Sequence, residues 1–216
     1  MSKAIPLGSI GNEKRIERRD AAENRALILA TAESLFAQHG VDNVNMADIA
    51  QAAGVGKGTL YRRFANKAEL CLALMDTQMS EFQNAMLERM RQMAADEIPA
   101  LEQLSQFLDA LIYFTDIHSP LLCEVQREGL LGDFGEEHQR PHFWQHMTVS
   151  GLLQTAVTNG ELPDNLDVAY ISDALLAPLH ANIFHFQRLG RGFSLERISA
   201  GLRSILQGLR YVQPEA

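Results

Sequence analysis

The sequence is poor in several features, and each shortage excludes a class of protein. It has only two cysteines, Cys71 and Cys123, too few for the disulfide framework of a small secreted domain, so both are expected to be reduced thiols. No run of 18 or more apolar residues occurs, which argues against a transmembrane helix. The first 30 residues contain basic side chains without an apolar segment behind them, so we expect no secretory signal and a cytoplasmic protein.

Lysine is also scarce, and its distribution is uneven. The four lysines are Lys3, Lys14, Lys57 and Lys67. Residues 1–70 carry ten basic and eight acidic side chains, whereas residues 71–216 carry nine arginines and nineteen acids. The net charge of −8 argues against a nucleic-acid partner for the chain as a whole. The asymmetry instead suggests an N-terminal surface that meets an anion and a C-terminal body that repels it.

Strand patterns are absent too, because no alternation of apolar and polar residues has a useful length. Apolar residues make up 46% of the chain, enough for a substantial core. Apolar side chains recur at helical spacing instead, and the predicted fold is all-α. We expect a flexible arm over residues 1–19, a three-helix head over 20–65, and a helical bundle over 66–216.

The segment from residue 45 to residue 64 has the pattern of a helix-turn-helix. Asn45 is a suitable N-cap for a short helix, and Asp48 can reach back to it as in a capping box. Gly54 stands where the turn requires a positive φ. A second short helix is expected from Lys57 to about Phe64, with Gly56 as its cap. In this motif the second helix enters the major groove of DNA.

The polar side chains of that second helix suit contact with DNA. Lys57, Tyr61 and Lys67 can bind phosphate oxygens, and Gly58 lets the backbone approach closely. Thr59 can touch a base edge, and Arg62 and Arg63 can bind phosphate or read guanine. The other interpretation of this face is an ordinary solvated surface. The DNA-binding residues predicted from this chemistry are Lys57, Gly58, Thr59, Tyr61, Arg62, Arg63 and Lys67.

These residues carry a resemblance to a known family. The stretch MADIAQAAGVGKGTLYRRFANKAEL, within about Leu27–Leu70, resembles the TetR family of bacterial regulators. The resemblance implies a helical homodimer whose C-terminal domain binds a small molecule that releases operator DNA. It also implies DNA contacts, and the positions that match are Asn45, Lys57, Gly58, Thr59, Tyr61 and Lys67. Gly56 and Arg63 depart from the family pattern, where a side-chain cap and a histidine are frequent.

Glycines and prolines divide the C-terminal part into expected helices. These helices cover about 66–93, 100–117, a short segment from Pro120 to 128, 141–159, 167–189 and 194–212. Pro178 lies inside the fifth and is expected to kink it. Asp167 and Ser194 are expected N-caps.

Methionine is concentrated in one helix, where it either packs a core or lines an adaptable pocket. The stripe consists of Met75, Met79, Phe82, Met86, Met90 and Met93. Methionine fills irregular space and adapts to varied partners. Because few polar groups accompany it, an apolar or aromatic effector is expected. The candidate effector-binding residues are Met79, Phe82, Met86, Phe107, Leu111, Phe114, His118, Cys123, Phe143, Met147 and Phe184.

The last two expected helices are strongly apolar, and we interpret them as a four-helix dimer interface. One helix-turn-helix makes few contacts, so a two-fold dimer reading two half-sites is expected. The candidate interface residues are Leu175, Leu179, Ile183, Ile198, Leu202, Ile205 and Leu209.

Three alternatives remain open at this point. His138, His142 and His146 have four-residue spacing near Glu137, but no third soft ligand is evident, so neither a metal site nor enzyme activity is expected. A non-allosteric architectural protein would bind DNA without a cavity or a sequence preference. An activator would share all these features. We expect a ligand-responsive repressor without a cofactor, which binds double-stranded operator DNA and a small effector but no membrane.

Overall fold

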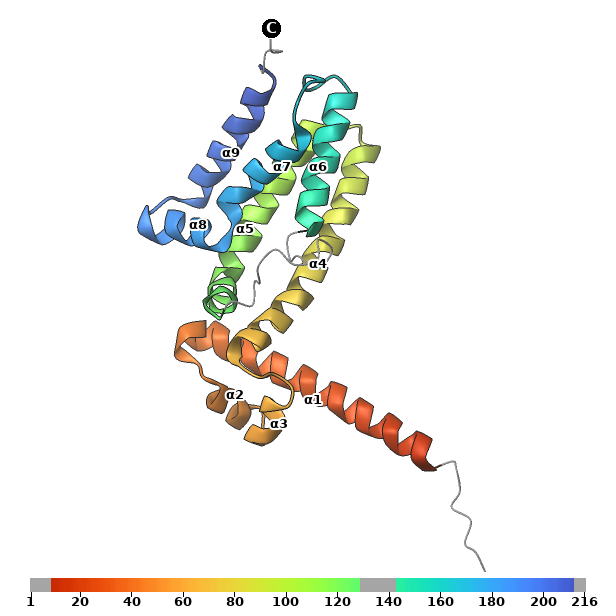
Figure 1. Ribbon diagram of the computed structural model, residues 1–216, viewed down its shortest axis with the longest axis vertical. Helices are drawn as coiled ribbons and strands as arrows, with labels where there is room; N and C mark the ends of the chain where they lie inside the picture. Colours follow the sequence, from red (N-terminus) through yellow and green to blue (C-terminus); the bar gives the residue numbers. More distant parts are fainter. Residues whose placement is uncertain (1–8, 129–142, 212–216) are drawn as a thin grey trace, which may run out of the picture. The chain divides into compact units, whose positions relative to one another are not determined.

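The computed structural model describes residues 9–128 and 143–211, with side chains from residue 21 onward. Every regular element within these residues is helical, which confirms the predicted all-α fold (Figure 1). The chain divides into two compact units, Met1–Leu74 and Met75–Ala216. The sequence placed the boundary at residue 65, nine residues earlier.

The N-terminal unit consists of α1 (Ser9–His39), a 3-10 turn (Val41–Asn43), α2 (Met46–Ala52), α3 (Lys57–Tyr61) and the beginning of α4 (Lys67–Ala95). Its core is built from one apolar face of each helix. α1 ends at Gly40, whose φ of 80° suits a helix stop. The side chains that are less than 9% exposed include Ile28, Ala32, Phe36, Ile49, Leu60, Phe64, Ala68, Leu70, Cys71 and Leu74.

The beginning of α1 differs from the prediction of a flexible arm over residues 1–19. The helix starts at Ser9, whereas the sequence indicated a start near Asp20. Residues 13–19 are mostly Glu, Lys and Arg, which lose little rotamer freedom in a helix. The predicted start near Asp20 depended on an apolar stripe, whereas a helix of residues with high helix propensity does not require one. Residues 1–8 lie outside the described part of the chain.

The C-terminal unit is a bundle around α5 (Ala100–Arg127). α5 packs against α6 (Phe143–Thr158), α8 (Ala181–His185) and α9 (Leu195–Leu209), and α6 also packs against α7 (Val168–Leu176). Figure 1 shows α5 between α9 on one side and α6 on the other. The buried core of this unit includes Met86, Leu104, Phe107, Leu108, Ile112, Val149, Leu153, Leu175, Phe184, Leu202 and Leu206.

Pro120 does not begin a separate helix, so that prediction was wrong. α5 is continuous across it. A proline inside a helix removes one backbone hydrogen bond and costs about 3 kcal/mol or more. Buried side chains before and after it, such as Leu111 and Leu121, hold the helix in the core. The end of α5 is seen end-on in Figure 1, which shows that the axis bends there, as expected at a proline.

Pro178 has a larger effect than the predicted kink. The segment expected as one helix is divided into α7, a 3-10 turn (Ala177–Leu179), α8 and a one-turn π-helix (Phe186–Gly190). His180 is extended, with a ψ of 138°, and separates the 3-10 turn from α8. The expected N-caps are confirmed, because Asp167 accepts from the Tyr170 amide and Ser194 from the Arg197 amide.

Candidate DNA-binding face and effector cavity

A complete capping box begins α2, as the sequence predicted. Asn45 Oδ1 accepts hydrogen bonds from the amides of Ala47 at 2.8 Å and Asp48 at 3.1 Å. In return the Asn45 amide donates to Asp48 Oδ2 at 2.9 Å. Asn45 Oδ1 is therefore committed to the helix, and its side-chain Nδ2 is the group that can donate to a phosphate.

The turn between α2 and α3 has the geometry that its glycine allows. Gly54 has a φ of +66°, and its amide donates to Gln51 O at 3.2 Å. The Val55 amide donates to Ala50 O at 3.0 Å. This pair of bonds is a Schellman motif, which ends α2 and fixes the direction in which the chain enters α3.

The short helix α3 presents one apolar face to the core and one polar face to solvent. Leu60 is fully buried and Phe64 is 3% exposed. Gly56 is its N-cap and supplies no side-chain bond, as expected. Tyr61 is 52% exposed. Lys57, Gly58, Arg62 and Arg63 are exposed as well, and Thr59 is half-buried.

The fold itself does not require two residues of this face. A Cβ added at Gly58 would meet no atom within 4 Å, and its φ is not positive. An exposed tyrosine likewise contributes little to a core. Their presence is consistent with contact to a partner, and a basic surface with an exposed aromatic is the pattern expected for DNA.

The first turn of α4 positions Lys67. Asn66 Oδ1 accepts from the Glu69 amide at 2.8 Å, and Glu69 Oε2 accepts from the Ala65 amide at 2.7 Å. These bonds cap the start of α4. Lys67, half-buried, follows the cap directly. In the same unit the Arg25 guanidinium lies over the Phe64 ring at 5.4 Å. The eight predicted DNA-binding residues all belong to this unit, and their contacts with DNA remain predictions.

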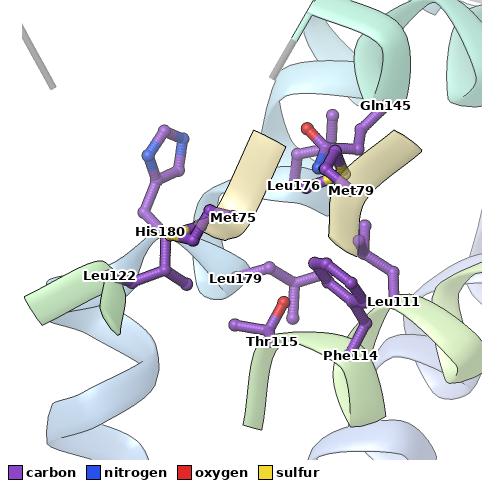
Figure 2. A pocket seen from close by; sticks show the side chains of 10 residues that line it. All are labelled: Met75, Met79, Leu111, Phe114, Thr115, Leu122, Gln145, Leu176, Leu179 and His180. Carbon is purple, nitrogen blue, oxygen red and sulfur yellow. The ribbon is translucent and has the colours of Figure 1, made fainter. Parts of the chain in front are cut away.

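A small apolar cavity lies in the C-terminal unit, with room for only a few water-sized groups. Its walls come from α4, α5, α6 and the α7–α8 segment (Figure 2). The lining residues are Met75, Met79, Leu111, Phe114, Thr115, Leu122, Gln145, Leu176, Leu179 and His180.

Three of the predicted effector residues, Met79, Leu111 and Phe114, line this cavity. Phe82 does not line the cavity, but its ring packs against Phe114, which does, with a centroid distance of 4.5 Å. The His118 ring also packs against Phe114, with a centroid distance of 4.2 Å.

Other predicted effector residues lie elsewhere. Met86, Phe107 and Phe184 are buried in the core and do not line the cavity. Cys123 contacts His185, with Sγ and Nδ1 3.5 Å apart. Met147 is 54% exposed, and Phe143 is half-buried at the start of α6.

Sequence reasoning missed the polar lining of the cavity. Thr115 is 5% exposed and Gln145 is 3% exposed. The signal for Thr115 was its position four residues after Leu111, on the same face of α5. Gln145 is a polar residue among apolar neighbours in α6. Such a residue either faces solvent or forms a polar contact inside the protein.

Most of the predicted dimer residues are already buried within the single chain. Leu175, Leu179, Ile198, Leu202 and Leu209 are each 7% exposed or less. Side chains without accessible surface can make few contacts with a second copy of the chain. They pack on α5 and its neighbours instead. Ile183 at 47% and Ile205 at 51% do remain exposed.

The histidine cluster falls partly outside the described residues, because His138 and His142 lie between 129 and 142. His146 Nε2 is 3.2 Å from Asp173 Oδ1. Among the described side chains, no group of three or more His, Cys, Asp or Glu is arranged to hold a metal. Within the same part of the chain, no helix is both long and apolar enough to span a membrane.

Comparison with known proteins places these features in a family. Residues 28–74 match the model of the bacterial regulatory proteins of the tetR family. An HTH-type transcriptional regulator of Staphylococcus aureus strain MRSA252 is 29% identical over 179 residues, covering 83% of this chain and 90% of the relative. A second such regulator, from strain bovine RF122, is 28% identical over the same shares.

Solved structures share the fold. FadR of Thermus thermophilus, a TetR-family repressor in complex with lauroyl-CoA, has a TM-score of 0.64 at 18% identity, covering 89% of this chain and 97% of that one. FadR of Bacillus subtilis, in complex with stearoyl-CoA, has a TM-score of 0.59 at 20% identity, covering 86% of this chain and 97% of that one. The helix-turn-helix, the family match over 28–74 and the shared fold agree. Residues 28–74 are therefore a DNA-binding helix-turn-helix of the tetR family of bacterial regulatory proteins, and the chain as a whole is similar to HTH-type transcriptional regulators.

Proposed function

We propose that the protein is a homodimeric repressor that a small, mostly apolar effector releases from its operator. The observation that carries the proposal is the α3 face. It exposes Tyr61, Lys57 and Arg62, and includes Gly58, although the core needs none of these side chains. The cavity in the C-terminal unit supplies the place for the effector.

The DNA half of the proposal follows from the chemistry of α3 and its flanks. Lys57, Tyr61 and Lys67 bind phosphates and orient the module. Thr59 and Arg62 or Arg63 reach base edges. A helix of five residues makes few base contacts, so affinity for a specific site comes from two copies on a near-palindrome.

The second copy docks on apolar side chains that the single chain leaves exposed. Ile183, Phe186 and Leu189 belong to α8 and the π turn after it, and Ile205 belongs to α9. Their exposed fractions are 47%, 57%, 74% and 51%. Large apolar side chains that a folded chain leaves exposed can serve as an interface with another protein. The interface therefore uses the outer faces of these helices and not the buried leucines.

The effector half rests on the composition of the cavity, together with the ligands of the structural neighbours. Two FadR proteins of the same fold bind lauroyl-CoA and stearoyl-CoA, so an acyl chain is the first effector to test. The cavity must widen to admit one. Met75 and Met79 in its wall have unbranched, flexible side chains that can move aside.

We attribute the release of the protein from DNA to a displacement of α4. The helix contains Lys67 near the DNA-binding residues and Met75 and Met79 in the cavity wall. A ligand that displaces the methionines shifts α4, which changes the spacing of the two α3 helices in the dimer. Couplings between sites are typically about 1–3 kcal/mol.

A selection of genomic fragments with purified protein, at two salt concentrations, tests the proposal. The expected result is an enriched near-palindrome, with binding weakened by salt. The double variant Tyr61→Ala, Lys67→Ala loses binding, whereas Tyr170→Ala, which removes an exposed tyrosine from α7, retains it. Lauroyl-CoA then releases the selected fragment.

Two results would count against the proposal. Retention of all fragments alike would indicate an architectural protein instead of a sequence reader. A palindrome from which neither acyl-CoA nor any other apolar compound releases the protein would refute the ligand-responsive part. The position of the palindrome relative to the promoter distinguishes repression from activation.

A further inference from the structure

Thr115 is a buried polar residue whose hydroxyl is directed into the cavity. The residue is 5% exposed and belongs to α5. Figure 2 shows its oxygen pointing into the space between Phe114 and Leu179. Among the described residues, we find no hydrogen bond of this hydroxyl. A hydroxyl that has no protein partner in an apolar cavity wall loses part of its hydration, so its place there requires an explanation.

Other threonines in helices show the hydrogen bond that the Thr115 hydroxyl could have made within its own helix. In α6, Thr148, Thr155 and Thr158 each donate from Oγ1 to the carbonyl four residues earlier, at 2.9, 2.9 and 2.8 Å. This bond is the usual way in which a helix satisfies a threonine. Thr115 turns its hydroxyl to the cavity instead.

Gln145, on another wall, adds a second polar group. Its Nε2 lies 3.7 Å from Met79 Sδ, and both side chains line the cavity. A thioether sulfur is a weak acceptor, and a carbonyl or hydroxyl oxygen is a better one.

The remaining lining side chains are apolar, apart from His180. No Asp, Glu, Lys or Arg contributes to the wall. His180 is an exposed residue, with its ring at the side of the cavity (Figure 2). An unpaired carboxylate or ammonium inside such a wall would lose its hydration without compensation. The part of an effector that enters the cavity must be neutral.

We propose that Thr115 is the hydrogen-bonding anchor of the effector, and that the effector places an apolar skeleton with a neutral hydroxyl or carbonyl oxygen in this cavity. Gln145 supplies a second donor on the opposite wall. This inference rests on the proposed function, because it names the ligand chemistry of the same site. It also explains why a threonine stands where valine would pack equally well.

The first test needs no ligand. Thr115→Val replaces the hydroxyl by a methyl group of similar size. If the hydroxyl has no partner in the free protein, the variant unfolds at a temperature about 2–4 °C higher than the wild type. Thr148→Val is the matched control, because its hydroxyl is bonded to Trp144 O, and it does not gain stability. A Thr115→Val variant that is less stable than the wild type would overturn the proposal.

The second test measures binding of 1-octanol, octane and octanoate. Trp144, the single tryptophan, reports on the cavity, because its ring contacts Phe82, which stacks on Phe114. The neutral 1-octanol is expected to bind at least tenfold more tightly than octanoate. Thr115→Val weakens octanol binding by about threefold to tenfold, the range for one hydrogen bond, and leaves octane unchanged. Equal binding of octanol by the variant would refute the anchor.

Operator binding, measured on the same preparations, separates this inference from the proposed function. A wild type that binds no specific DNA refutes the proposed function whatever the probes do. A wild type that binds its operator while none of the three probes alters Trp144 emission overturns only the assignment of the cavity.

Discussion

Arg188 forms an ion pair with Asp116, 72 residues earlier in the chain, with Nε and Oδ1 2.7 Å apart. The Nη1 atom of the same guanidinium donates to the Phe193 carbonyl at 2.6 Å. One side chain thus joins α5 to the π turn and to the loop before α9. Each partner of the pair is 29% exposed, so solvent screens the interaction only in part.

We expect Arg188→Met to lower the free energy of unfolding by about 2 kcal/mol, as measured by urea denaturation. Hydrogen bonds to a charged group are worth about 1.5–3 kcal/mol. Arg91→Met is the control, because the Arg91–Glu88 pair has side chains 75% and 77% exposed. Its effect should stay within about 0.5 kcal/mol. Equal effects of the two variants would show that Arg188 contributes no more than a surface pair.

Gly58→Ala should leave the fold intact while removing operator binding. Space is open around this position, and alanine in a helix is more stable than glycine by about 0.5–1 kcal/mol. The added methyl group would instead stand between α3 and the DNA backbone. Thermal unfolding and gel-shift titration measure the two effects separately. Gly151→Ala in α6, also in open space, is the control and should bind DNA normally.

Gly54→Ala should lower the stability of the fold, in contrast to Gly58→Ala. Its φ of +66° costs an alanine about 1–2 kcal/mol, although no atom lies within 4 Å of the added Cβ. Unfolding monitored by circular dichroism should show that loss. Gly54→Asn should lose less, because asparagine tolerates this conformation better. Identical stabilities of the alanine and asparagine variants would argue against backbone strain.

Asn45 combines a cap with a predicted DNA contact, and two substitutions distinguish them. Asn45→Ala should lower stability by about 1 kcal/mol, because it removes both bonds to Oδ1. Asn45→Ser keeps a cap but lacks the amide Nδ2. A serine variant of normal stability with weaker operator binding would support the contact. Normal binding by that variant would assign Asn45 to the cap alone.

Glu196 gives α9 a small dependence on pH. Its pKa is lowered from the usual value by a hydrogen bond to its own backbone and by another to Ser194. A lowered pKa means that the stabilisation is present above the pKa of the unfolded chain and is lost as pH falls through the folded value. Glu196→Gln should therefore be less stable than the wild type near neutrality. The difference, followed by thermal unfolding, should vanish in acid.

Local chemistry explains which elements could be predicted from the sequence. The box of Asn45 and Asp48, the turn at Gly54 and the caps of α7 and α9 each depend on residues within four positions of one another. Such signals do not need the rest of the fold. The helix-turn-helix was accessible for the same reason.

Features that depend on distant partners could not be predicted in this way. The apolar faces of α7 and α9 indicate burial, but they do not say whether the covering surface belongs to the same chain. Leu175 and Leu202 were therefore predicted as interface residues, although both are buried within the single chain. The continuity of α5 through Pro120 likewise depends on packing that only the folded unit supplies.

The shared helix α4 has a consequence for chimeric regulators. Ala68, Leu70, Cys71 and Leu74, from its first two turns, are part of the core of the N-terminal unit. A splice at residue 65, where the motif ends, would graft a head stripped of these side chains. Exchange of heads between relatives should instead join the chains after Leu74, so that each head keeps its own stretch of α4 and each sensor starts at Met75.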